Sequence, residues 1–280
     1  MGIKRLLVVY SGEAGKSGGL QVAIDLARMS GAHLSGVVAR GPGEIENRIG
    51  SRPSVTRFLS SGLLDVLQEV GTRTIGEIRS AFETRMETEG LAGRSAFIDL
   101  DLRRGGTLAE LARSYDLVIM GRRASDIGRE FVQENPDEIA LSSGRPLILA
   151  PSRPIVLPDR LHGLVAWDGK RAAARALGDA LHVLGLCERM SVLSVGEKAA
   201  SAADDGIMQL LDHHGVRAER LHRHAAQGGI SGTILGTCRD VGANLLIMGA
   251  YERSKLLEDF WGGVTRDILN DADIPVLMAH

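Results

Sequence analysis

The sequence predicts an α/β protein made of two tandem doubly wound domains, each with a five-stranded, mainly parallel sheet. The first observation is a repeated pair of apolar segments, YDLVIMG at Tyr115–Gly121 and ANLLIMG at Ala243–Gly249. After a stretch long enough for a helix, each is followed by a second apolar segment, RPLILAP from Arg145 and IPVLMAH from Ile274. Short apolar runs closed by glycine are typical of buried parallel strands. The order strand, helix, strand therefore occurs twice.

The beginnings of the two halves also correspond. RLLVVYSG at Arg5–Gly12 and LHGLVAWDG at Leu161–Gly169 are both apolar strands that end in a polar residue and glycine. Each is followed by a predicted helix and then by a second strand: Gly18–Ser30 and His33–Ala39 in the first half, Lys170–Leu186 and Met190–Val195 in the second.

The middle of each half completes the pattern. Apolar residues at helical spacing predict a long amphipathic helix over Gly62–Glu89, whose counterpart, Ala203–His214, is much shorter. The remaining predicted strands are Ser95–Leu100 and Val216–His222, and the remaining helices are Thr107–Ser114 and Ile230–Val241. Alternation of this kind requires right-handed crossovers and a sheet covered on both faces. Pro154 and Pro158 mark a linker, so we expect domains at residues 1–153 and 159–280.

Composition excludes several classes of function. The 280 residues carry a formal net charge of −2, so we expect no nucleic-acid partner. No apolar run has the roughly eighteen residues of a membrane-spanning helix, and we expect a cytoplasmic protein without a membrane partner. Cys187 and Cys238, the only cysteines, are expected inside helices and form neither a metal-spaced pair nor a disulfide framework.

The segment that follows the predicted strand at Ala243–Gly249 carries the most specific motif. Gly249–Thr265 reads GAYERSKLLEDFWGGVT, which resembles the nucleotide loop of the universal stress protein family. That loop has Gly, two residues, Gly, nine residues, Gly, then Ser or Thr. Gly249 and Gly262 match its first and third positions, Glu252 replaces the second Gly, and Gly263 replaces the Ser or Thr. The resemblance covers nearly the whole chain as two copies and implies an adenine-nucleotide α-hydrolase-like fold and a role in stress survival.

The resemblance also implies a nucleotide site in the second half, for ATP or another adenine nucleotide, with Mg²⁺ as an optional companion. Asp168 and Gly169 would lie near the ribose and phosphates, and the backbone of Val195 would contact adenine. The phosphates would lie near the start of a helix, where free N–H groups attract anions, at Gly262, Gly263, Val264 and Thr265. Glu252 opposes a triphosphate unless a metal ion or Arg253 intervenes. The alternative is that the glycines, Gly249 included, serve only tight turns and close packing.

The first half lacks most of this motif. Ser11 replaces the Asp, and no Gly-Gly or Gly-Ser pair precedes the last helix, which Pro136 is expected to begin after Asn135 as N-cap. Three arginines, Arg122, Arg123 and Arg129, would more commonly be solvated surface residues than an anion site. We therefore expect no nucleotide here.

Other residue patterns give little support for a P-loop, a metal site or a catalytic triad. GEAGKS at Gly12–Ser17 has too few residues before its Gly-Lys pair to be a P-loop. The histidines at 213, 214, 222 and 224 are expected at the surface or as caps rather than as metal ligands. No Ser/His/Asp arrangement can be identified from spacing.

Three functions compete at this point. The protein is a regulatory module that binds an adenine nucleotide, a scaffold with decayed sites that binds a protein or another small ligand, or a slow ATP hydrolase. No general base is evident for the hydrolase, so we do not expect an enzyme. The family resemblance further implies an intramolecular pseudo-dimer in which Leu147–Ala150 lies beside Val276–Ala279. A homodimer and a regulatory protein partner are the remaining expectations.

Overall fold

The structure, a computed structural model, describes residues 2–10, 18–40, 61–102, 105–122, 136–196, 202–250 and 263–279. The first half contains β1 (Arg5–Val9), α1 (Gly18–Ser30), β2 (His33–Arg40), α4 (Ser61–Thr88), the 3-10 helix η1 (Ala92–Arg94), β3 (Ser95–Asp101), α5 (Leu108–Ala112), β4 (Leu117–Gly121), α6 (Pro136–Ser142) and β5 (Leu147–Ala150). The second half contains β6 (Leu161–Ala166), α7 (Arg171–Leu184), β7 (Cys187–Val195), α8 (Ala202–His213), β8 (Ala218–Arg223), α9 (Gly229–Val241), β9 (Leu245–Gly249), α10 (Gly263–Asp271) and β10 (Val276–Ala279).

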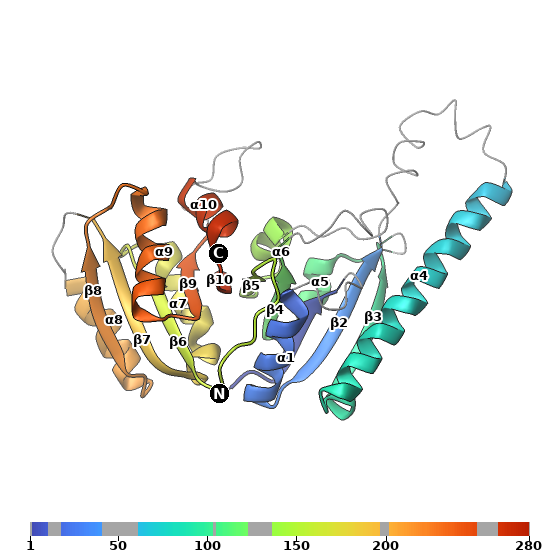
Figure 1. Ribbon diagram of the computed structural model, residues 1–280, viewed down its shortest axis with the longest axis horizontal. Coiled ribbons are helices and arrows are strands. Elements are labelled where there is room, and N and C mark those ends of the chain that lie inside the picture. Colours follow the sequence, from blue (N-terminus) through green and yellow to red (C-terminus); the bar gives the residue numbers. More distant parts are fainter. Residues whose placement is uncertain are drawn as a thin grey trace.

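All ten of these strands form one sheet, in the order β3-β2-β1-β4-β5-β10-β9-β6-β7-β8 (Figure 1). Every neighbouring pair is parallel except β5 and β10, which run antiparallel with Leu149 opposite Val276. The predicted contact between the two final strands is confirmed. The two expected five-stranded sheets are therefore continuous with each other, and the α/β fold class is confirmed.

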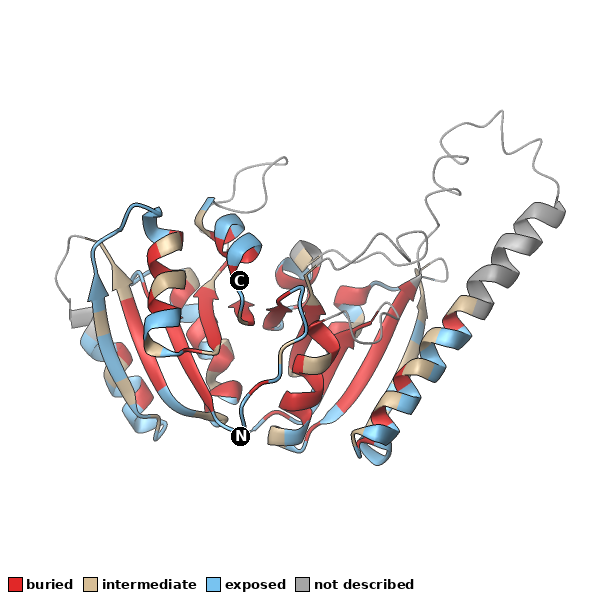
Figure 2. Cartoon of the chain, viewed as in Figure 1, coloured by how far each residue is buried: buried red, intermediate tan, exposed pale blue. Residues whose placement is uncertain are grey.

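Helices cover both faces of this sheet. One buried cluster joins the sheet to α1, α4, α7 and α8, and the other joins it to α5, α6, α9 and α10. Successive strand residues alternate between the clusters: Leu6 and Val8 belong to the first, and Leu7 and Val9 to the second. Figure 2 shows the buried residues concentrated on the central strands and on the helix faces that meet them.

The long helix α4 is attached to the sheet through Phe82. The ring of Phe82 lies over Gly36, where a Cβ atom would come within 2.5 Å of a ring carbon. Its centroid is 5.8 Å from that of Tyr10 and 5.7 Å from that of Phe97, in tilted pairs. Burying an aromatic side chain of this kind contributes about 1.5–3 kcal/mol. The absence of a side chain at Gly36 thus permits the packing of α4 on β2.

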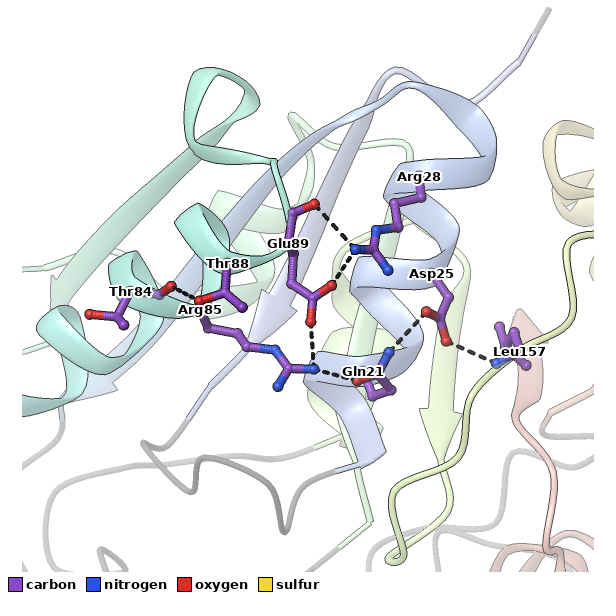
Figure 3. A network of polar contacts seen from close by, with 8 residues as sticks. All are labelled: Gln21, Asp25, Arg28, Thr84, Arg85, Thr88, Glu89 and Leu157. Atoms are coloured by element: carbon purple, nitrogen blue, oxygen red, sulfur yellow. Dashed lines mark hydrogen bonds and ion pairs between the residues drawn. The ribbon is translucent and has the colours of Figure 1, made fainter.

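A polar network connects α1, α4 and the segment between the halves (Figure 3). The buried Asp25 accepts hydrogen bonds from the backbone N–H of Leu157 and from Gln21 Nε2, both at 2.9 Å. Arg85 of α4 donates to Gln21 at 2.7 Å and pairs with Glu89 at 2.8 Å. Burial raises the pKa of Asp25 above its ordinary value, and the hydrogen bonds oppose that shift. Asp25 therefore holds the inter-half segment on α1.

The structure corrects one expectation about the cysteines. Cys187 begins strand β7, three residues before the predicted strand, and only Cys238 lies in a helix. Burial raises the pKa of both thiols to about 12, so both are protonated at neutral pH. Within the described parts of the chain, no helix is long and apolar enough to span a membrane.

Candidate nucleotide site

The predicted site residues of the second half lie at one edge of the sheet. Ala166, at the end of β6, pairs with Leu193 of β7 and with Met248 of β9. The loops that follow these three strands therefore begin next to one another at the carboxyl edge of the sheet. Chain order reverses between β6 and β9, because β7 and β8 follow on one side and β10 lies on the other. Ligands of open parallel sheets bind at such a reversal, outside the carboxyl ends of the strands.

Asp168 occupies the turn between β6 and α7. Its Oδ1 accepts a hydrogen bond from the backbone N–H of Lys170 at 3.0 Å, and its Oδ2 lies 3.8 Å from Lys170 Nζ. Half of the Asp168 side chain is exposed. Gly169 adopts φ +74°, a left-handed conformation that side chains disfavour. The turn thus orients a carboxylate that still has lone pairs available to a ligand.

Gly249 lies where the end of β9 meets the first turn of α7. A Cβ atom at this position would be 2.4 Å from the backbone carbon of Ala172 and 2.6 Å from the nitrogen of Ala173. No side chain fits there without displacing the helix. Gly249 therefore satisfies the close-packing interpretation, because it brings the start of α7 directly against β9.

Val195 offers a backbone group at the same edge. The carbonyl of Leu193 accepts from the N–H of Trp167 at 2.8 Å, toward β6, whereas Gly196 donates to Arg223 of β8. Alternate residues of a strand point their backbone groups toward the same neighbour. The carbonyl of Val195 is therefore directed to the β6 side, beyond Ala166, where β6 has ended.

Helix α10 begins at Gly263, which is exposed and has no atom of a described residue within 4 Å of a Cβ position. Val264 is half-buried, and Thr265 is buried. Because α10 connects the parallel strands β9 and β10, it runs back along the sheet and begins at their carboxyl edge. Ser231 of α9 donates to Asp267 at 3.2 Å and joins the two helices. The predicted Gly262 and the replacement Glu252 lie outside the described residues.

The structure thus places Asp168, Gly169, Val195 and Gly249 at the carboxyl edge of the strands, and α10 begins at the same edge. Thr265, also predicted for the site, is buried. A helix N-terminus with free N–H groups suits an anion, and an oriented carboxylate suits hydroxyl groups. The combination fits a ligand that carries both an anionic group and hydroxyl groups.

In the first half, the structure contradicts the expectation for Arg122. Its side chain is half-buried rather than solvated, and its Nη1 donates to the carbonyl oxygen of Leu269 in α10. Pro136 begins α6 as predicted. Other first-half residues named above lie outside the described residues: Ser11, the segment Gly12–Ser17, Arg123, Arg129 and Asn135.

The structure also brings together three polar side chains that sequence spacing did not reveal. His162 Nε2 is 2.9 Å from Ser191 Oγ, which donates to Glu219 Oε1 at 2.8 Å. Because the single hydroxyl proton goes to Glu219, Nε2 must carry the proton in its bond to Ser191. His162 therefore does not accept the proton of this serine, which is fully buried, so the pair is not the Ser–His arrangement of nucleophilic catalysis. Only strand pairing in three dimensions places these residues side by side, so no local signal could have identified them.

The four histidines considered as metal ligands are divided between the two ends of β8. His213 and His214 precede the strand, whereas His222 and His224 lie at its other end, with rings 5.6 Å apart in an edge-on arrangement. Among the described residues, no group of three or more His, Cys, Asp or Glu side chains is placed to hold a metal ion.

Comparisons with known proteins support the fold. A model of the universal stress protein family matches residues 163–280. The structure of a universal stress protein from Archaeoglobus fulgidus DSM 4304 is similar over 98% of this chain and 95% of that chain, with a TM-score of 0.67 and 15% identity. A functionally unknown protein from Pseudomonas aeruginosa PAO1 is similar over 99% and 92%, with a TM-score of 0.58 and 16% identity. A search of curated proteins found no match.

Proposed function

We propose that this protein is a stress-response regulator of the universal stress protein family that binds an adenine nucleotide, ATP above all, in its second half. The match of the family model to residues 163–280 and the similar fold over the whole chain support this proposal. One observation carries the proposal. The half-exposed carboxylate of Asp168 and the exposed start of α10 lie at the carboxyl edge of the second half's strands, the edge at which strand order reverses between β6 and β9.

Each group would contribute a distinct interaction. Asp168 would accept hydrogen bonds from the ribose hydroxyls, and the Val195 carbonyl would accept one from the adenine amino group. The free N–H groups of Gly263 and Val264 would donate to phosphate oxygens, where the helix dipole also favours negative charge. Mg²⁺ would neutralise part of the phosphate charge when it accompanies the nucleotide.

Calorimetric titration of the full chain with ATP tests this proposal. We expect Asp168→Ala to weaken ATP binding at least tenfold, because a hydrogen bond to a charged group contributes about 1.5–3 kcal/mol. Asp168→Asn, which retains an acceptor oxygen, should weaken binding less. Asp212→Ala removes an exposed carboxylate beyond the far end of β8 and serves as the matched control, with unchanged affinity expected. No ATP binding by the parent protein would contradict the proposal.

The second candidate is a nucleotide-independent scaffold that binds a protein or another small ligand. The packing of Gly249 on α7 favours it, because that glycine has a structural role without any ligand. The same titration distinguishes the two candidates. ATP hydrolysis is not part of either proposal.

The proposal also covers where the protein acts and what it binds. We propose a cytoplasmic protein that acts through a regulatory protein partner. The pairing of β5 with β10 occupies, within one chain, the strands that universal stress protein domains are expected to use in dimers. A homodimer of this chain would therefore form through another surface. Sedimentation of the purified protein tests its existence.

A further inference from the structure

Arg122 connects the first half of the chain to helix α10 of the second. It follows β4, and its backbone N–H donates to the carbonyl of Ala150 at 2.9 Å, which fixes it at the carboxyl edge beside β5. From there the side chain crosses the β5–β10 junction, and Nη1 donates to the carbonyl oxygen of Leu269. The contact joins residues that are 147 positions apart in the sequence.

The carbonyl of Leu269 is one that needs an external donor. The last four carbonyls of an α-helix have no partner within it, and α10 ends at Asp271. The carbonyl of Ile268 accepts from Ala272 N at 2.8 Å, and Arg122 serves the next one. A cation at a helix C-terminus is also favoured by the helix dipole. Burial lowers the pKa of Arg122, and the negative charges of Asp273 and Asp271 oppose that effect, so the guanidinium remains charged.

In the equivalent helix of the first half, α6, a different residue donates to the C-terminal carbonyls. Arg113, which caps α5, donates from Nη2 to the carbonyl of Ser142 at the end of α6, at 3.3 Å. In the second half, the corresponding cap of α9 is Gly242, which has no side chain to reach α10. In the first half, an arginine of the same half thus donates to the C-terminal carbonyls of the last helix. In the second half, Arg122 of the first half does so instead.

We propose that Arg122 is a positioning residue for the nucleotide site of the second half, acting through α10. The proposal rests on the nucleotide binding proposed above. Helix α10 has only nine residues, so a contact at Leu269 fixes the direction in which Gly263 and Val264 present their N–H groups at the other end. Small displacements of positioned groups have large effects on ligand interactions. The first half, without a nucleotide motif of its own, thus controls the affinity of the second.

Two variants of Arg122 and one control test this proposal in the full chain. Arg122→Met keeps the length of the side chain but removes its charge and donors, whereas Arg122→Lys keeps a charged donor. Arg153→Gln is the control, because Arg153 lies in the inter-half segment and forms an exposed ion pair with Asp273, 3.5 Å away and just after α10. The measurements are the dissociation constant for ATP, the melting temperature, and hydrogen exchange of the amides of Asp267–Asp271.

We expect Arg122→Met to weaken ATP binding at least fivefold, the lower end of typical coupling between sites, and to accelerate amide exchange in α10. Arg122→Lys should recover most of the loss, and Arg153→Gln should stay within twofold of the parent. A melting temperature that stays near the parent's value separates positioning from general destabilisation. If Arg122→Met does not fold, Arg122→Gln is measured against the same threshold.

The outcomes separate this proposal from the one on which it rests. If the parent binds no ATP, the proposed function fails, and with it the link between Arg122 and nucleotide affinity. If the parent binds ATP and Arg122→Met binds it equally well, nucleotide binding stands and the positioning role is overturned. Weakened binding without rescue by Arg122→Lys also overturns it, because any disruption near the junction would then suffice.

Discussion

At Gly249 the end of β9 touches the first turn of α7, and the structural role of this glycine can be separated from a role in nucleotide binding. A methyl group here would overlap backbone atoms of Ala172 and Ala173. We expect Gly249→Ala to lower the free energy of unfolding by about 2 kcal/mol, within the usual range for overpacking. Urea denaturation measures the change.

Gly178 provides the matched control for that substitution. It lies in the same helix, α7, and no atom of the described residues is within 4 Å of a Cβ position there. Gly178→Ala should therefore raise the free energy of unfolding by about 0.5–1 kcal/mol, because alanine loses less backbone entropy in a helix. If Gly249→Ala were as stable as the parent, close packing would not explain this glycine.

These residues also show what the sequence can and cannot predict about the site. The residue pattern together with the family resemblance predicted Asp168, Gly169 and Gly263 as site residues, because their positions follow from neighbours along the chain. It left two readings for Gly249, because the choice depends on Ala172, which approaches only after β6 and β9 pair. It missed the contact of Arg122 because no local pattern indicates a partner in the other half.

At the scale of elements, apolar runs predicted the strands well where both faces are buried. The start of β7 was missed because Cys187, Glu188 and Arg189 are half-buried or exposed and lack an apolar run. Strand β8 was found with a shifted boundary for a similar reason, since most of its residues are exposed at the edge of the sheet. A hydrophobic pattern identifies a strand through its buried residues, so strand segments that are weakly buried, as at the edge of a sheet, are harder to predict.

The contact of His162 with Ser191 and Glu219 links β6, β7 and β8 and predicts a dependence of stability on pH. Burial, reinforced by the charge of Arg189, lowers the pKa of His162 below the ordinary value of 6.5, and Glu219 opposes the shift. Below pH 6.5 the unfolded chain therefore takes up a proton that the folded chain resists, so acid favours unfolding. Above that pH the residue is neutral in both states and has no such effect.

The variant His162→Gln isolates this effect, because glutamine keeps an N–H donor for Ser191 and does not titrate. Between pH 7.5 and 5.5, the parent should lose more unfolding free energy than His162→Gln, because only the histidine takes up a proton more readily in the unfolded chain. Urea denaturation at each pH gives the difference. Parallel pH profiles for the two proteins would show that His162 does not resist protonation in the fold.

At the scale of the whole molecule, the two halves share one sheet and two continuous cores. Ile148 of β5 and Leu277 of β10 face each other across the junction and belong to the same buried cluster. Leu149 and Val276 do the same in the cluster on the other face. The repeat in the sequence predicted two similar halves, but the meeting of their last strands followed from the family resemblance. The residues of β5 and β10 alone do not identify their partner.

Continuity of the cores predicts that the halves unfold together, and the distribution of tryptophan makes this measurable. Both tryptophans, Trp167 and Trp261, lie in the second half, so their fluorescence reports on that half alone. Leu117→Ala creates a cavity at the start of β4 in the first half, which should cost about 3 kcal/mol. We expect the urea midpoint of tryptophan fluorescence to fall together with that of far-ultraviolet circular dichroism.

Leu245→Ala is the matched variant, because Leu245 occupies the same place at the start of β9 and is equally buried. In a single cooperative unit, the two substitutions lower the fluorescence midpoint by similar amounts, since either cavity destabilises the whole sheet. In two independent units, Leu117→Ala would leave the fluorescence midpoint unchanged and split the circular dichroism transition into two steps. That result would mean that three backbone pairs between β5 and β10 do not couple the halves, and it would remove the structural basis for control of α10 by Arg122.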